Sequence, residues 1–152
     1  MKRTLIATAG IAALVTAGCG GSGGDDQSQS GAAAARTVDV DMVDTAFQPA
    51  MVTATAGERI RLAFRNKGSA AHDAFIGDVA AQADHEQEMR QAEKDGHSGG
   101  HGDDDTDEAA LTLKPGKTGE LTYTFDRAGT VEIGCHQPGH YAAGMKIAVT
   151  VT

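Results

Sequence analysis

The stretch Gly134-Cys-His-Gln-Pro-Gly-His-Tyr-Ala-Ala-Gly-Met145 organises the rest of this chain. It places a thiol, an imidazole and a thioether at the spacing C-x4-H-x4-M, on Cys135, His140 and Met145. Thiolate and thioether are soft ligands, imidazole is borderline, and the loop has no carboxylate, so the set suits copper better than other common metals. A trigonal copper site needs one more imidazole, with the thioether as a weak axial ligand. His72, on a separate upstream segment, is the candidate.

The first eighteen residues have the pattern of a secretory signal. Lys2 and Arg3 give a positive start, and residues 5–15 form an apolar run too short to span a bilayer. Small residues directly before Cys19, with glycines after it, resemble a bacterial lipobox. We therefore predict a signal peptide over residues 1–18, a lipidated Cys19, and an exported protein anchored to the outer face of the cell membrane or held in the periplasm. An ordinary secreted protein with an additional cysteine is the alternative.

Once Cys19 is acylated, Cys135 is the single remaining thiol of the chain. A lone cysteine cannot form an intrachain disulfide, and a bare thiol is a liability in an oxidising compartment. A metal-ligand role for Cys135 explains its presence, and a buried inert cysteine is the alternative.

Apolar and polar residues alternate along several short segments after a Gly/Ser/Ala-rich tether over residues 19–36. Such alternation is typical of half-buried strands, and turn residues separate the segments. The expected strands are residues 37–42, 59–65, 121–125, 131–133 and 147–151. Short strands at these intervals predict one all-β sandwich domain over residues 37–152.

An acidic insert over residues 78–110 interrupts this rhythm. It holds eleven acidic and two basic side chains, a net charge of −9, so the remainder of the chain is close to neutral and offers no basic surface for nucleic acid. Residues 79–94 are rich in Ala, Gln and Glu and predict a short exposed helix, with His85 and Met89 at i, i+4 on one face. Together with His97 and His101 these residues form a candidate weak secondary metal site. A solvated, charged loop is the favoured reading of the insert.

Here the sequence resembles the cupredoxins, the small blue copper proteins. The resemblance covers residues 37–152 apart from the insert and is carried by Phe47-Gln48-Pro49, by Asn66-Lys67-Gly68 before His72, and by the closing Cys-x-x-Pro-Gly-His-x-x-x-Gly-Met pattern. It implies an eight-stranded Greek-key β-sandwich that holds one copper ion, alternating between Cu(I) and Cu(II). It also implies the ligand set His72, Cys135, His140 and Met145.

Two residues beside the ligands depart from simple expectations. Asp73 follows His72, where related proteins often have an Asn that ties the two ligand loops; a carboxylate there either lowers the reduction potential or faces solvent. His136 follows Cys135, should point away from the sulfur, and is expected at the surface, near an outlet for electrons.

The resemblance implies an electron carrier rather than an enzyme, because protein fills every coordination position. Redox partners would dock weakly at the small apolar residues around His140, namely Pro138, Gly139, Ala142 and Ala143. A copper-binding or copper-delivery protein that uses the His/Met/acidic insert is the alternative. A domain of a larger oxidase is disfavoured.

Overall fold

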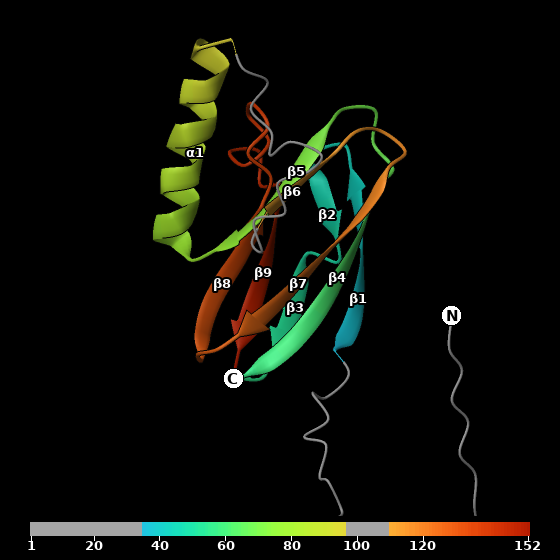
Figure 1. Ribbon diagram of the computed structural model, residues 1–152, viewed down its shortest axis with the longest axis vertical. Helices are drawn as coiled ribbons and strands as arrows, with labels where there is room; N and C mark the ends of the chain where they lie inside the picture. Colours follow the sequence, from blue (N-terminus) through green and yellow to red (C-terminus); the bar gives the residue numbers. More distant parts are fainter. Residues whose placement is uncertain (1–34, 97–109) are drawn as a thin grey trace, which may run out of the picture. The chain divides into compact units, whose positions relative to one another are not determined.

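Two β-sheets face each other in the computed structural model, which describes residues 35–96 and 110–152 (Figure 1). The first sheet has the strand order β2-β1-β4-β7 and the second β3-β9-β8-β5-β6. The strands of the first sheet are β1 (Arg36–Val43), β2 (Ala46–Gln48), β4 (Glu58–Asn66) and β7 (Thr118–Phe125). Those of the second are β3 (Met51–Ala54), β5 (His72–Gly77), β6 (Ala110–Leu113), β8 (Gly129–Gly134) and β9 (Lys146–Val151).

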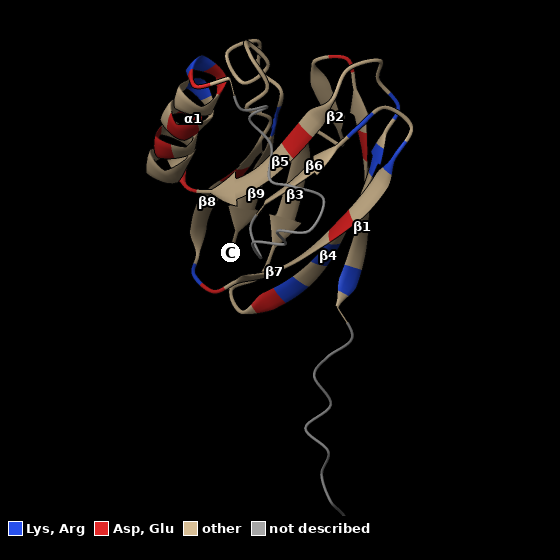
Figure 2. Cartoon of the chain, turned by 45° about the horizontal axis from the view of Figure 1, so that its top comes forward, with Lys and Arg blue, Asp and Glu red and all other residues tan. Residues whose placement is uncertain are grey.

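The predicted alternation produces the core between these sheets. In β4, Ile60, Leu62 and Phe64 are buried, while Arg61 and Arg65 point outward. The outward side chains of β4 form ion pairs with acidic residues of β1 and β7, such as Arg65 with Asp39 at 2.9 Å. Figure 2 marks basic and acidic residues along the strands of this sheet. Such exposed pairs contribute little stability, so the buried apolar side chains hold the sheets together.

The strand connections give the predicted Greek-key sandwich of the cupredoxin type, and the fold prediction is confirmed. The chain leaves the first sheet after β2 and joins the second at β3, across the cis peptide bond between Gln48 and Pro49. The pairs β1–β4 and β3–β9 are parallel, and the other neighbours are antiparallel. Because this change of sheet divides one edge into β2 and β3, the described part of the chain has nine strands rather than eight.

The predicted helix is present as α1 (Val79–Lys94), between β5 and β6 (Figure 1). The Asp78 side chain caps it by accepting hydrogen bonds from the N–H groups of Ala80 and Ala81, at 3.0 and 2.9 Å. The helix is less exposed than expected, because it packs on β5 and β8 and buries Gln82 and His85. α1 is therefore part of the folded domain.

The predicted signal peptide, Cys19 and most of the tether lie outside the described residues. β1 begins at Arg36, at the end of that tether. Among the residues that the structure describes, no helix is both long and apolar enough to cross a membrane.

Candidate metal centre

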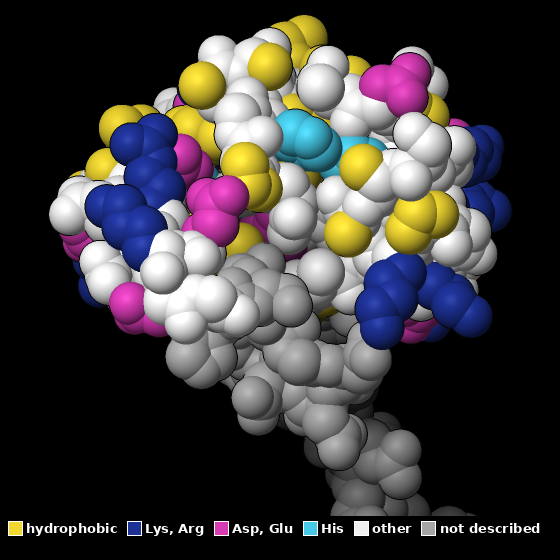
Figure 3. Space-filling view, turned by 90° about the horizontal axis from the view of Figure 1, so that it is seen from above, with side chains coloured by type: hydrophobic (Ala, Val, Ile, Leu, Met, Phe, Trp, Pro, Cys, Tyr) yellow, Lys and Arg dark blue, Asp and Glu magenta, His cyan; other side chains and the backbone are white. Residues whose placement is uncertain are grey.

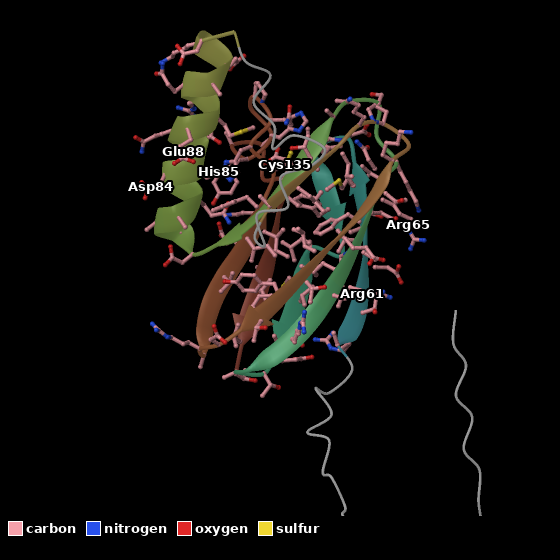
Figure 4. All side chains as sticks on the ribbon, viewed as in Figure 1. Arg61, Arg65, Asp84, His85, Glu88 and Cys135 are labelled. Atoms are coloured by element: carbon pink, nitrogen blue, oxygen red, sulfur yellow. The ribbon has the colours of Figure 1, made fainter. Side chains whose placement is uncertain are left out.

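The predicted ligands lie at one end of the second sheet. His72 begins β5, Cys135 follows the last residue of β8, and Met145 directly precedes β9. Because β5 and β8 are antiparallel neighbours, the start of the first strand lies beside the end of the second. Pairing within one sheet therefore brings residues separated by a long stretch of sequence to the same end of the strands, where Figure 4 labels Cys135.

Three of the four predicted ligands converge. One donor atom from each of His72, Cys135 and His140 lies within 4.8 Å of the others. Cys135 Sγ is 3.8 Å from His72 Nδ1 and 3.5 Å from His140 Nδ1. A thiol and two imidazoles at this separation fit a trigonal copper ion.

The fourth predicted ligand, Met145, is fully buried and belongs to the same loop. Its N–H donates to the carbonyl of His140 at 3.0 Å, and its carbonyl accepts from the N–H of Cys135 at 3.1 Å. Gly139 and Gly144 turn the chain with φ of +81° and +93°, which disfavours other residues there. Backbone hydrogen bonds and these two glycine turns thus close the loop by themselves.

Asp73 ties the two ligand segments together, as an Asn would, and the alternative that it faces solvent is wrong. Its side chain is 1% exposed and accepts hydrogen bonds from the N–H groups of His136 and Gln137, each at 3.0 Å. Its Oδ1 also lies 3.3 Å from Cys135 Sγ. A buried carboxylate is therefore directly beside the thiol ligand.

Burial and this carboxylate both disfavour ionisation of the thiol. Burial, and then the charge of Asp73, raise the pKa of Cys135 well above its ordinary value. Burial also lowers the pKa of His72, and the neighbouring His140 adds to that effect. Without a metal the site therefore favours a neutral thiol and a neutral imidazole. A bound cation reverses this balance, since a coordinating thiol is deprotonated.

The His72 ring is held tightly from behind. A Cβ at Gly68 would lie 2.7 Å from His72 Nε2, so only glycine fits there without displacing the ring. Nε2 is buried and has no hydrogen-bond partner among the described residues. The free edge of the ring, at Nδ1, faces Cys135.

The prediction that His136 lies at the surface is wrong. It is 3% exposed, because α1 covers the side of β8 to which its ring points. Its Nε2 lies 2.7 Å from Gln82 Oε1 and its Nδ1 lies 2.6 Å from Glu86 Oε2. Its orientation away from the sulfur follows from strand alternation, but the helix that meets it could not be placed from that pattern.

The predicted secondary metal site is only partly described. His85 is on the side of α1 that faces the sheet, where its ring stacks on Phe75 with centroids 4.1 Å apart (Figure 4). Met89 is half-buried on the same helix. His97 and His101 lie outside the described residues, so this site stays a prediction.

His140 is the most accessible of the predicted ligands. It is half-buried, whereas His72, Cys135 and Met145 are buried. The neighbouring loop residues Pro138, Gly139, Ala142 and Ala143 are exposed. Figure 3 shows histidine reaching this face among small hydrophobic and uncharged groups.

Comparison with known proteins identifies the family of this chain. A family model described as a cupredoxin-like domain matches residues 8–93, which include His72 but end before the Cys135 loop. The copper-resistant cuproprotein CopI of Pseudomonas aeruginosa is 35% identical, with 79% of this chain and 78% of that protein covered. CopI of Rubrivivax gelatinosus is 37% identical, with 79% and 68% covered.

A solved structure supports the same relationship. Reduced auracyanin of the photosynthetic bacterium Roseiflexus castenholzii superposes with a TM-score of 0.63 at 27% identity, covering 78% of this chain and 98% of that one. The sandwich, the converging ligand loop and the sequence matches agree, and the chain belongs to the cupredoxin-like family.

Proposed function

We infer that this protein binds one copper ion as a type 1 centre and carries single electrons between redox partners at the cell envelope. The observation that carries this proposal is the convergence of His72, Cys135 and His140 within 4.8 Å, beside a fully buried Met145. When bound there, copper supplies one-electron chemistry between Cu(I) and Cu(II).

The chain's own residues keep the donor atoms in place while the charge of the site changes. Strand pairing supports His72 and Cys135, Asp73 joins their segments, and the bonds between Met145 and the other loop ligands close the loop. Because these contacts restrict the movement of the ligands, oxidation and reduction of the metal need little rearrangement of the donor atoms. A site of this kind favours rapid electron exchange.

A carrier is favoured over an enzyme because protein side chains supply every donor. Catalytic metal sites usually keep one position open for water or substrate. Burial of Cys135 and Met145 leaves His140 as the ligand closest to solvent. We propose that partners dock briefly on the small exposed residues around His140, and that a lipid on Cys19 holds the exported protein at the membrane.

A role in copper tolerance is the second candidate, favoured by the relatives that are called copper-resistant cuproproteins. In that case, His97 and His101 of the insert would collect copper for the buried site. Deletion of the whole insert would not test this cleanly, because it removes Gln82 and Glu86, which contact the copper loop through His136. A double His97→Ala, His101→Ala variant is sharper. Slower copper loading at low supply with unchanged electron exchange supports a handling role, and unchanged loading argues against it.

The test of the main proposal is the visible spectrum of the full chain with Cu(II). We expect an intense thiolate-to-copper band that Cys135→Ser abolishes. Cys19→Ser, which removes the chain's other cysteine, should retain it. Absence of the band from the wild-type protein would refute a blue copper centre.

For electron carriage, the self-exchange rate of the copper-loaded protein is the measurement. Ala142→Asp adds a charge to the proposed docking surface, so it should slow self-exchange while leaving the band in place. Equal self-exchange rates in this variant and the wild type would argue against docking at that surface.

A further inference from the structure

Helix α1 is fastened to the sheet beside the copper loop by one fully buried amide. Gln82 Nε2 donates to the carbonyls of Phe75 and Glu132, at 3.1 and 2.8 Å, and lies 3.3 Å from the carbonyl of Gly77. Three surrounding carbonyls fix which end of the amide is the nitrogen, so Oε1 must point the other way. It points at His136.

The ring of His136 is consequently held at both nitrogens by α1. Nε2 donates to Gln82 Oε1 at 2.7 Å, and Nδ1 meets Glu86 Oε2 at 2.6 Å. Burial raises the pKa of Glu86, but His136 and then Arg90 outweigh that effect and bring it below its ordinary value. Glu86 is therefore a carboxylate in position to accept.

The contact between α1 and His136 reaches two of the three predicted ligands of the closing loop, Cys135 and His140. His136 is the next residue after Cys135, and its ring stacks on Tyr141, with centroids 4.6 Å apart and planes 22° apart. Tyr141 follows His140 and donates its hydroxyl proton to Glu132 on β8. A displacement of His136 would thus be transmitted to the residues on which Cys135 and His140 depend.

The packing between α1 and the closing loop leaves no room for a side chain at Gly134. A Cβ at Gly134, directly before Cys135, would lie 2.5 Å from Gln82 Oε1 and 2.8 Å from Tyr141 Cε2. Strand, helix and loop meet there at the closest distance that a glycine allows. The helix of the insert is therefore built into the copper loop.

We propose that Gln82 and Glu86 of α1 are positioning residues for the metal centre, which hold the Cys135–His140 loop in its ligating geometry through the ring of His136. The inference rests on the copper function proposed above, and it assigns that function a part of the chain outside the loop and its strand neighbours. The insert helix holds the His136 side chain, while Asp73 holds the backbone N–H of the same residue.

The experiment compares three full-chain variants with the wild type. Glu86→Ala removes the contact with Nδ1, and Glu86→Gln keeps a hydrogen-bonding group in the same place without the charge. Asp84→Ala is the matched control, because its carboxylate is exposed on the same helix, whereas Glu88 lies 3.7 Å from His85, whose ring packs against His136. The first measurement is amide hydrogen exchange of His136 and Gln137 in the copper-free protein, and the second is the reduction potential and visible spectrum after copper loading.

We expect Glu86→Ala to speed exchange at these two amides by about tenfold to a hundredfold, the range given by losing one hydrogen bond to a charged group. It should also shift the potential and the visible band. Glu86→Gln should restore all three measurements toward wild type, and Asp84→Ala should leave them unchanged.

Two outcomes would overturn the proposal. If Glu86→Gln behaves like Glu86→Ala, the negative charge of Glu86 acts on the site directly, and its hydrogen bond to His136 does not position the loop. If Glu86→Ala lowers only the melting temperature, α1 is a structural support with no influence on the site. Because exchange is measured without copper, a failure of copper binding itself would be recognised separately.

Discussion

Asp73→Asn is predicted to make the thiol of Cys135 much easier to ionise. Asn has nearly the shape of Asp and keeps one oxygen to accept from the N–H groups of His136 and Gln137. It removes a negative charge whose oxygen lies 3.3 Å from Cys135 Sγ. The substitution therefore changes the electrostatics of the site while retaining its main hydrogen bonds.

The magnitude follows from that distance. At an effective dielectric constant of about 20, two unit negative charges 3.3 Å apart repel by about 5 kcal/mol. Backbone N–H groups of His136 and Gln137 already neutralise part of the carboxylate, so we take roughly half of this value as effective. That corresponds to a fall of about two pKa units for Cys135. At a pH below both pKa values, the thiolate fraction then rises about a hundredfold.

The assay is the alkylation rate of Cys135 in the copper-free protein, in a Cys19→Ser background. A thiolate of lower pKa is less nucleophilic, with a Brønsted coefficient of about 0.5, so the expected acceleration is about tenfold. Asp39→Asn removes a carboxylate that is 70% exposed on the outer face of the other sheet, and it should have no effect. An alkylation rate for Asp73→Asn equal to the wild-type rate would refute the reasoning. With copper bound, the same substitution should raise the reduction potential, because losing negative charge favours Cu(I).

Three further outcomes are expected. Because its pKa is raised, Cys135 keeps its proton in the folded copper-free protein, whereas in the unfolded chain it loses that proton above pH about 9. Above that pH, urea denaturation should therefore show the free energy of unfolding falling by about 1.4 kcal/mol per pH unit. Cys135→Ser should remove that slope up to pH about 10, where Tyr141, whose pKa is also raised, begins to contribute. Gly68→Ala should push the His72 ring from its place and weaken copper binding, measured by competition with a chelator, by about 1–3 kcal/mol. Phe64→Ala, in the middle of the core, should lower the free energy of unfolding by about 3–5 kcal/mol without altering the visible band.

Much of this fold is predictable from the sequence because its signals are local. Alternation in residues such as Ile60, Leu62 and Phe64 marks strands directly, and the helix bounds Val79–Lys94 follow from composition over one continuous segment. The spacing of Cys135 and His140 is likewise contained in one loop. These features depend only on residues that are neighbours in the sequence, so one sequence is enough to predict them.

The surroundings of the site depend instead on which surfaces meet, and no local pattern contains that information. Alternation places His136 on the face opposite the sulfur, but it does not state that α1 covers that face. For the same reason, the sequence predicted an exposed helix, although Gln82 and His85 are buried against the sheet. For Asp73, the sequence left two environments open, and its burial beside Cys135 became visible only with β5 and β8 paired.

The arrangement of charges gives an independent reason to expect a cation in this site. Without a cation, the buried carboxylate of Asp73 faces the buried thiol of Cys135. Burial of the thiol and the charge of the carboxylate both make ionisation of the thiol unfavourable. The rings of His72 and His140 lie 5.1 Å apart, and burial, followed by the neighbouring His140, lowers the pKa of His72. The sheet limits how far His72 and Asp73 can move from Cys135, since β5 carries the first two, β8 ends directly before Cys135, and both strands are paired on either side. A positive ion among them would offset the desolvation of the thiolate, so binding it should stabilise the folded state.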